Sequence, residues 1–514
     1  MITFAGVRNT TNMENLHISE QEQIRRDALN ELAQLNINPY PAREFPVDTT
    51  ATEILEGYDP EKENFKHVTL AGRIMGRRIM GAASFMVIQD HTGRIQVYVK
   101  RDEICPQEDK TLYNTVFKRL MDIGDIVGIT GYAFITKTGE ISVHAKELTL
   151  LSKSLRVLPI VKEKEDRIYD AFTDPEQRYR MRYVDLIVNP HVKDTFISRT
   201  KIVNTMRDFF NSFGYLEVET PILQPIPGGA NARPFKTHHN ALDIPLYLRI
   251  ANELYLKKLI VGGFPGVYEF SKDFRNEGMD RTHNPEFTVL EIYVAYKDYF
   301  WMMNFTEQLV EKVALALHRT TKVPLGDTII DWKRPFRRIT MLDAIKEYTG
   351  VDVSDMDEEA LRSICNKLNV YAEPAMGKGK LIDALFGAYC EKHLIQPTFV
   401  TDYPIATSPL SKKHRSNPNL TERFELFVNG KELANAYSEL NDPVDQLERF
   451  REQLKLKEKG DEEAMFIDMD FIRALEFGMP PTSGMGIGID RLCMLMTNSQ
   501  SIQDVLFFPQ MRPE

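Results

Sequence analysis

The alternation of hydrophobic and polar residues first predicts a helix near the start of the chain. Ser19, with Glu22 three residues later, forms a capping-box sequence, which is typical of a helix N-terminus. Apolar residues then recur at helical spacing and predict one buried face, made of Ile24, Ala28, Leu32 and Leu35. We expect this helix to end before Asn38-Pro39. Residues 1–65 are therefore predicted to be a helical extension and a charged linker, of which residues 1–12 carry little pattern.

From residue 66 the hydrophobic period changes from that of a helix to that of strands. Ile95, Val97 and Val99 alternate strictly with polar neighbours, as in a half-buried strand. The pattern predicts strands over residues 68–75, 85–90, 95–100, 123–134 and 141–149, and a helix over residues 111–121. Three strands, a helix and two strands is the order of an OB-fold barrel, so this fold is predicted for residues 66–150.

After a linker at residues 151–173, helices and strands alternate from residue 174 to the end. A more helical and charged insert is predicted at about residues 331–417. The chain is thus expected to be an α+β multidomain protein in which a small β-barrel precedes a larger mixed domain of residues 174–514.

Composition narrows the classes of function. The 514 residues contain no run of about 18 apolar residues, so we expect no membrane span. The net charge of −10 argues against bulk attraction to nucleic acid, but residues 66–150 hold twelve Lys and Arg against nine Asp and Glu, a local charge of about +3. The four cysteines form no Cys-x-x-Cys pair, and the N-terminus has no secretory pattern, so a reducing cytoplasmic location is expected.

The common phosphate-binding loops are missing. Gly377-Lys-Gly-Lys380 lacks the upstream glycine and the hydroxyl residue of a P-loop, and the glycines of Gly484–Gly488 have the wrong spacing for a dinucleotide turn. Nucleotide binding therefore requires another scaffold.

Three blocks in the second half of the chain resemble the signatures of class II aminoacyl-tRNA synthetases. In chain order they are the helix from Thr200 with Gly214–Pro221, the run Phe274-Arg-Asn-Glu-Gly278 with Thr282–Phe287 and Leu290–Tyr293, and Gly484–Arg491. The class I signatures are absent. The resemblance implies an OB-fold anticodon module followed by an antiparallel catalytic sheet flanked by helices. It also implies a homodimer, because the first signature forms the dimer interface in that family.

Carboxylate activation by ATP brings two anions together, and a planar guanidinium can grip both. Arg275 is the candidate. By resemblance, Arg275 contacts the α-phosphate and the amino-acid carboxylate, and Phe287 and Arg491 enclose the adenine ring, so these two arginines are the expected catalytic residues. The implied ATP-binding set is Arg275, Glu277, His283, Asn284, Phe287 and Arg491.

Glu425 and Glu432 are the candidate metal ligands. They would converge if they lay on two strands joined at Asn429-Gly430, the strongest short hairpin signal in the chain. Paired carboxylates suit Mg²⁺ beside a triphosphate, and the family places magnesium ligands at the matching positions. His238 and His239 have no partner at ligand spacing and are interpreted as structural.

Glu253, Glu291 and Glu439 lie in blocks that would line the substrate pocket. Such an excess of carboxylates favours a cationic substrate. Ile226–Phe235, Glu253–Lys257 and Asn435–Asp442 resemble the lysine-specific members of the family. Their implied lysine-binding residues are Gly229, Glu253, Arg275, Glu291, Tyr293, Asn435 and Glu439. The alternative for Glu291 and Glu439 is a structural ion pair with arginines of the chain.

In the barrel, Phe85, Gln96 and Arg78 are predicted to contact the anticodon, with Phe85 stacking on a base. The partners implied by the resemblance are ATP, L-lysine and the tRNA for lysine, with Mg²⁺ as cofactor. Two other functions remain open, a ligase that attaches lysine to a protein and a non-catalytic RNA-binding relative. The first should lack the barrel, and the second should have lost the ATP arginines or the metal carboxylates.

Overall fold

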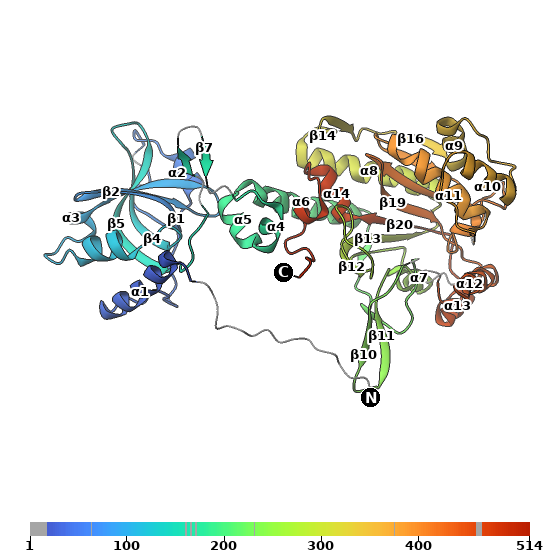
Figure 1. The fold of residues 1–514 in the computed structure, drawn as a ribbon, viewed down its shortest axis with the longest axis horizontal. Coiled ribbons are helices and arrows are strands. Elements are labelled where there is room, and N and C mark those ends of the chain that lie inside the picture. The colour runs from blue at the N-terminus through green and yellow to red at the C-terminus, as the bar shows by residue number, and fades with distance from the viewer. Residues whose placement is uncertain are drawn as a thin grey trace. The chain divides into compact units, whose positions relative to one another are not determined.

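The chain folds into two compact units, Met1–Thr173 and Asp174–Glu514, which are described separately (Figure 1). The computed structural model describes residues 18–62, 64–159, 162–164, 167–169, 172–230, 232–374, 376–458 and 465–513. Residues 1–12, to which the sequence assigns no function, lie outside these ranges.

The first unit contains a closed five-stranded barrel with the strand order β1-β2-β3-β5-β4. Its strands are β1 (Val68–Met80), β2 (Ala83–Gln89), β3 (Arg94–Lys100), β4 (Ile126–Ile135) and β5 (Ile141–Ser152). Every second residue of β2 and β3 points into the barrel core, as the alternating sequence predicts. The predicted helix between β3 and β4 is the π-helix η2 (Leu112–Leu120), preceded by a short helix α3 (Arg101–Ile104) that the pattern did not indicate.

Helix α1 (Glu20–Gln34) begins with the predicted capping box, but its buried face differs from the prediction. Ile24 is 59% exposed, whereas Arg25 is only 7% exposed. The Arg25 guanidinium donates hydrogen bonds to the backbone carbonyls of Ile123, Ser154 and Arg156. Because unpaired backbone carbonyls are costly to bury, a satisfied arginine occupies the inner face here and the isoleucine remains outside.

The second unit is built on an eight-stranded sheet with the order β16-β17-β18-β19-β20-β13-β12-β8. Its strands are β8 (Leu216–Glu217), β12 (Gly266–Phe274), β13 (Glu286–Ala295), β16 (Arg337–Thr340), β17 (Thr398–Thr401), β18 (Arg423–Val428), β19 (Lys431–Ser438) and β20 (Thr482–Gly488). The six central strands pair antiparallel, as expected, but the edge pairs β16 with β17 and β12 with β8 are parallel. The sheet is therefore mixed.

The main hydrophobic core lies on one face of this sheet. Helices α6 (His191–Ser212), α8 (Tyr299–His318) and α14 (Ile489–Met496) contribute to it, and alternate residues of the central strands point toward them. On β13, Leu290 and Ile292 join this core, whereas Glu291 and Tyr293 point to the opposite face. That opposite face is left for a binding site.

The predicted insert is only partly a separate body. Helices α9 (Met341–Thr349), α10 (Glu358–Lys367) and α11 (Lys378–Tyr389) enclose a hydrophobic cluster of their own. The strands on either side of these helices, β16 and β17, belong to the main sheet. The helices are thus an insertion between the edge strand β16 and its neighbour β17.

Shorter elements complete the two units. They are α2 (Ala51–Gly57), β6 (Lys162–Lys164), β7 (Arg167–Tyr169), α4 (Pro175–Arg180), α5 (Arg182–Val188), β9 (Leu223–Gln224), β10 (Lys236–His239), β11 (Ile244–Leu248), α7 (Glu253–Val261), β14 (Lys322–Leu325), β15 (Thr328–Asp331), η3 (Glu391–His393), η4 (Ile405–Thr407), α12 (Pro443–Glu458), α13 (Met469–Glu476) and α15 (Ile502–Val505). None of the helices in the described ranges combines the length and the apolar character that a membrane span needs.

Candidate active site

A cavity of about 400 Å³ opens on the sheet face opposite the main core. Strands β12, β13, β18, β19 and β20 form its base, and residues from the loop after β12 and from η4 close its sides. All the residues predicted to bind ATP, lysine or metal line it, except Glu439. They are Gly229, Glu253, Arg275, Glu277, His283, Asn284, Phe287, Glu291, Tyr293, Glu425, Glu432, Asn435 and Arg491.

The glycines of β20 make room for the cavity's acidic side chains. A Cβ atom on Gly484 would lie 2.2 Å from Oε1 of Glu439 and 2.3 Å from the Tyr293 ring. A Cβ on Gly486 would lie 2.7 Å from Oε1 of Glu291. Because real Cβ atoms do not approach other atoms so closely, the alternating glycines are required by the carboxylates that pack on the strand.

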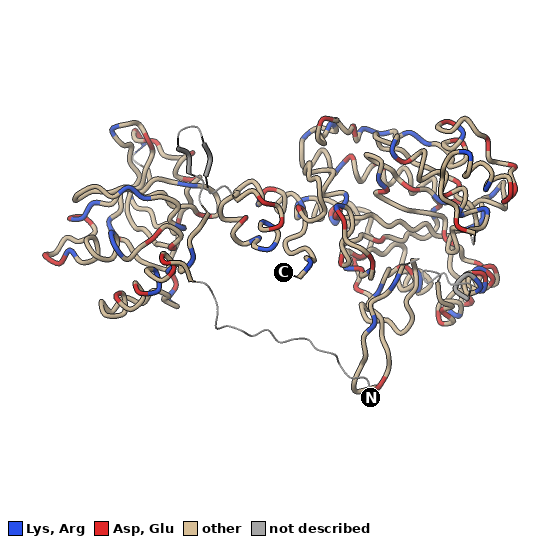
Figure 2. The backbone as a smooth tube through the Cα atoms, in the orientation of Figure 1, with Lys and Arg blue, Asp and Glu red and all other residues tan. Residues whose placement is uncertain are grey.

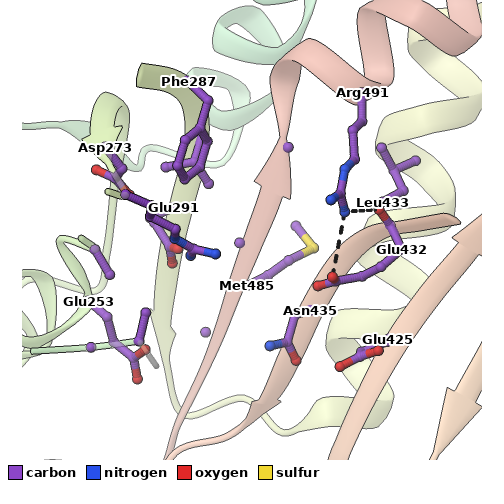
Figure 3. Close-up of a pocket in the computed structure, with 18 of the residues that line it drawn as sticks. Glu253, Asp273, Phe287, Glu291, Glu425, Glu432, Leu433, Asn435, Met485 and Arg491 are labelled. Carbon is purple, nitrogen blue, oxygen red and sulfur yellow. Dashed lines mark hydrogen bonds and ion pairs between the residues drawn. The ribbon is translucent and has the colours of Figure 1, made fainter. Parts of the chain in front are cut away.

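The two predicted catalytic arginines lie on different walls of the cavity. Figure 3 shows Phe287, Glu291 and Asp273 on one side of β20 and Arg491, Glu432 and Glu425 on the other. The Arg275 guanidinium lies 5.1 Å from the centre of the Phe287 ring, a cation–π contact. Its buried Nε has no hydrogen-bond partner among the described residues, so this donor can take an acceptor from a ligand.

Arg491 is held in place from two directions. Its Nη1 donates to the backbone carbonyl of Glu432 at 2.7 Å (Figure 3). Its Nη2 lies 3.2 Å from Nε2 of His283. Nδ1 of His283 lies 2.9 Å from Oδ2 of Asp280. Burial alone would raise the pKa of Asp280, but hydrogen bonds from His283 and Thr282 outweigh it and hold this pKa well below its usual value. The carboxylate thus stays charged and orients the histidine.

The other end of the cavity is acidic and contains a buried lysine. Lys257, four residues after Glu253 on α7, forms ion pairs with both Glu253 and Glu439. The Tyr437 hydroxyl donates to Oε1 of Glu253 at 2.6 Å. The Lys257 side chain is 0% exposed, and so is that of Glu439. Lys257 and Glu439 therefore have no contact with bulk water, whereas Glu253 lines the cavity.

Glu439 occupies a different place from the one its predicted role requires. Its carboxylate is not among the groups that line the cavity but packs over Gly484 beside the Tyr293 ring, where it pairs with Lys257 through Oε2. The sequence-based alternative of an ion pair within the chain is thus partly realised, although the partner is a lysine and not an arginine. Oε1 of Glu439 is buried and has no hydrogen-bond partner among the described residues.

Glu291 is a buried carboxyl group in this acidic end. It accepts a hydrogen bond from the Tyr293 hydroxyl at 2.9 Å. Burial, together with the neighbouring charge of Glu253, raises the pKa of Glu291 to about 8. Asp273, on the adjacent strand β12, is also shifted, because burial raises its pKa to about 6 although Arg249 opposes the shift. The surroundings of Glu291 and Asp273 thus disfavour negative charge, and a bound cation would favour it.

A β-bulge brings the two candidate metal ligands to one face of the sheet. Glu425 pairs with Asn435 across β18 and β19, and Glu432 pairs with Phe427 after a register shift that leaves Leu433 as the extra residue. Without the bulge, Glu432 and Asn435 would point to opposite faces of the sheet, because they are three residues apart. The hairpin turns at Asn429-Gly430, as predicted, and both residues have positive φ.

The charges around Glu425 favour a cation. Burial raises the pKa of Glu425 to about 8, and the negative charge of Glu432 adds to this shift. The Arg423 guanidinium opposes the shift, and its Nη2 donates to Oε1 of Glu425 at 2.6 Å. Two hard oxygen donors that repel each other fit a divalent cation such as Mg²⁺. In the described part of the chain no group of three His, Cys, Asp or Glu side chains suits a metal. His238, which the sequence analysis interprets as structural, is exposed, and its Nε2 lies 3.0 Å from Oδ1 of Asp243.

The barrel carries the predicted nucleic-acid residues on its outer surface. Arg78 on β1 pairs with Phe85 on β2, which pairs with Tyr98 on β3, so these side chains form a row. Gln96 lies two residues before Tyr98 on the same face of β3 and donates to Ser142 at 2.9 Å. The ring centres of Phe85 and Tyr98 are 5.1 Å apart. Acidic and basic residues are mixed over this unit, so the aromatic row is its more specific feature (Figure 2).

Sequence reasoning missed three cavity groups. Lys257 lies one helical turn after Glu253, a spacing that favours an ion pair. Arg423 shares a strand face with Glu425, two residues away, and its Nε donates to Oδ1 of Asn435 at 3.0 Å. Asp273 lies near the end of β12, two residues before Arg275, at the cavity wall. Only the first two have a spacing that the sequence could have revealed.

Comparisons with known proteins agree with this arrangement. Residues 174–512 match the family of class II tRNA synthetases (D, K and N), and residues 68–151 match the OB-fold nucleic acid binding domain. Lysine–tRNA ligase of Porphyromonas gingivalis is 65% identical over 503 residues, 98% of this chain and 87% of that protein. The same enzyme of Christiangramia forsetii is 64% identical over 97% of this chain and 87% of its own. That of Azobacteroides pseudotrichonymphae is 62% identical over 97% of this chain and 99% of its own.

These matches cover both units, and the cavity carries the arginines and carboxylates expected from the signature blocks. The chain therefore belongs to the lysine–tRNA ligases, a family of class II aminoacyl-tRNA synthetases.

Proposed function

We propose that the cavity joins L-lysine to ATP and then passes the lysyl group to the tRNA for lysine. A carboxylate oxygen of lysine attacks the α-phosphorus of ATP, the bond to the β-phosphate oxygen breaks, and pyrophosphate leaves. The 3′-hydroxyl of the terminal tRNA adenosine then attacks the lysyl carbonyl carbon, and AMP leaves. The observation that carries this proposal is one cavity lined by both Arg275 and Arg491 and by the buried carboxyl groups of Glu253 and Glu291.

The chain's residues would act mainly by binding and orientation, which supply most of the catalysis in phosphoryl transfer. Arg275, whose Nε lacks a partner among the described residues, would hold the lysine carboxylate against the α-phosphate. Phe287 and Arg491 would lie on the two faces of adenine, Glu277 would accept from its amino group, and His283 would bind the distal phosphates. Asn284 also lines this part of the cavity.

The acidic end would recognise the two ammonium groups of lysine. Glu253 and the backbone of Gly229 would bind the α-ammonium. A larger residue at position 229 would be crowded, because its Cβ atom would lie 3.0 Å from that of Ala251. Glu291, with Tyr293, would bind the ε-ammonium. Glu439 would contribute negative charge through Oε1, and Asn435 would help to hold the carboxylate. Seryl or aspartyl substrates would leave these carboxylates without a counter-ion.

Amino-acid specificity is the direct test of this function. Pyrophosphate exchange should be measured with each amino acid separately, with and without tRNA. We expect exchange with lysine alone among the common amino acids. Exchange driven equally well by another amino acid would contradict the proposed substrate.

Glu425 and Glu432 are proposed to hold Mg²⁺, which would offset the negative charge of the triphosphate. Replacing both with glutamine should raise the Mg²⁺ concentration needed for half-maximal exchange by at least about 10-fold, the smallest cost of losing even an outer-shell partner. The control is Glu448→Gln with Glu452→Gln, which removes the same charge from exposed positions on α12. A magnesium titration identical to that of the parent would remove the pair from the metal site.

The barrel face of Arg78, Phe85 and Gln96 is proposed to bind the anticodon. Phe85→Ala should weaken binding of the tRNA for lysine by about 1–3 kcal/mol, because one base stack is lost. Phe264→Ala, which removes an exposed phenylalanine from the other unit, should leave the Kd unchanged. A filter-binding or anisotropy titration measures both. If Phe85→Ala binds the tRNA as tightly as the parent, this face is not the anticodon reader.

We also propose that the chain acts as a homodimer in the cytoplasm. Exposed apolar residues near the first signature support a contact with a second copy. They include Ile197 on α6, Phe213 after it, Leu216 on β8, and Ile222 and Leu223, each more than 40% exposed. In the family this region forms the subunit interface. The barrel and the retained arginines and carboxylates argue against a protein lysine ligase and a non-catalytic relative.

A further inference from the structure

Lys257 is a fixed positive charge inside the substrate end of the site, and the proposed function gives it no contact with substrate. Its side chain is fully buried and pairs with carboxylates from two elements, Glu253 on α7 and Glu439 after β19. Glu253 lines the cavity, whereas Lys257 does not. The lysine thus pairs with one carboxylate that lines the cavity and with a second that packs over Gly484 of the glycine strand.

The surroundings of Lys257 hold its ammonium charged and in one place. Its Nζ lies 5.4 Å from the ring centre of Tyr437, 5.8 Å from that of Phe471 and 5.9 Å from that of Tyr293, so three rings surround it. Burial would lower the pKa of Lys257, but the charges of Glu253 and Glu439 outweigh it and raise this pKa. The cation is therefore permanent near neutral pH.

The pairing also leaves particular oxygen atoms available. Lys257 pairs with Oε1 of Glu253, the oxygen that also accepts from Tyr437, and with Oε2 of Glu439. Oε1 of Glu439 has no hydrogen-bond partner among the described residues. Each carboxylate is thus fixed through one oxygen and retains another for a second cation.

We propose that Lys257 is a positioning residue that sets the separation of the Glu253 and Glu439 carboxylates, and that this separation selects an amino acid with the length of lysine. The proposal rests on the proposed function. Without Lys257, the carboxylates of Glu253 and Glu439 would repel each other and could move. Their separation could then change to fit shorter diamino acids. With Lys257 between them, the two acceptors are held at one spacing, so a substrate lacking one methylene group, such as ornithine, fits poorly.

The test compares Lys257→Met with Lys258→Met. Lys258 is the next residue of α7, has the same charge, and pairs with Asp470 at 2.8 Å, away from the cavity. Lys257→Met should raise the KM for lysine by about 10²-fold, consistent with the cost of leaving buried carboxylates without their partner. The ratio of lysine to ornithine kcat/KM should fall at least 10-fold, and the KM for ATP should change less than twofold. Lys258→Met should match the parent in all three.

A merely structural lysine would give another pattern. It would lower the thermal midpoint and the amount of active enzyme, while the KM for lysine and the ornithine discrimination of the folded fraction stayed at parent values. That result would overturn the proposal. The parent protein must first show lysine-dependent exchange, so failure of the proposed function would appear in the parent, before any variant is compared.

Two more variants keep the test decisive if Lys257→Met does not fold. Lys257→Met combined with Glu439→Gln removes one charge of each sign from the buried network. Because Glu253 would still lose its partner, the double variant should have a higher KM for lysine than Glu439→Gln alone, and equal values would overturn the proposal. Lys257→Arg keeps the charge but is wider, so it should raise the KM for lysine about 3- to 10-fold. A parent-like KM in Lys257→Arg would also overturn it.

Discussion

Replacing Arg275 with alanine should lower the rate of lysine-dependent pyrophosphate exchange by about 10²-fold or more. This is the scale of loss when one preorganised donor to a developing negative charge is removed. Arg275 lies over the Phe287 ring and has a buried Nε without a partner among the described residues, so its donor is aimed at a ligand. Exchange rates at saturating and limiting ATP should both fall, because the guanidinium is proposed to contact both reactants.

Arg281→Ala is the matched control for Arg275→Ala. Arg281 lies in the same loop, is exposed, and does not line the cavity. Its loss should leave the exchange rate within about twofold of the parent, which corresponds to less than about 0.5 kcal/mol. If the folded Arg275→Ala protein exchanges pyrophosphate as fast as the Arg281→Ala protein, Arg275 has no part in the first step.

The second large effect concerns Glu291 and pH. Burial raises the pKa of Glu291 to about 8, so its carboxyl group is mostly protonated at pH 7 before a cation binds. A substrate ammonium pairs with the ionised form, and binding must therefore release a proton below pH 8. We expect kcat/KM for lysine to rise by up to about 10-fold per pH unit between pH 6 and 8, and to level off above pH 8.

Glu291→Gln should remove this rise and lower kcat/KM for lysine at pH 8 by about 10- to 10³-fold. The reason is the loss of a charge-assisted hydrogen bond in a buried site, worth roughly 1.5 to 4 kcal/mol. Glu286→Gln, an exposed change on the same strand, is the control. Exchange assays from pH 6 to 9 at saturating ATP measure both. A pH dependence that persists unchanged in Glu291→Gln would assign it to another group, such as Asp273, whose pKa is about 6.

The sequence predicted the parts of the site that depend on local patterns. Asn429-Gly430 indicated a hairpin, and the hairpin places Glu425 and Glu432 on adjacent strands. Glu291 and Tyr293, which the sequence indicated only through the resemblance, lie two residues apart on β13 and so share a face. Such features follow from residues a few positions apart, which is why periodicity and turn chemistry reveal them.

The remaining features depend on contacts between distant segments. The bulge at Leu433, which turns Glu432 toward the cavity, has no strong sequence signal. The burial of Arg25 in place of Ile24 depends on carbonyls of residues about 100 to 130 positions away. Likewise, Glu439 packs over Gly484 and pairs with Lys257, which lies 182 positions earlier in the chain. Apolar periodicity carries no information about such long-range polar partners.

The glycine strand has a consequence for redesign of the substrate end. Oε1 of Glu439 occupies the space that a methyl group at residue 484 would need, and Glu291 does the same at residue 486. A shorter side chain at residue 439 would open only part of that space, because the Tyr293 ring would still block a methyl group at residue 484. Residues 293, 439 and 484 are therefore coupled, and an attempt to convert the site to a smaller neutral amino acid should change all three positions together.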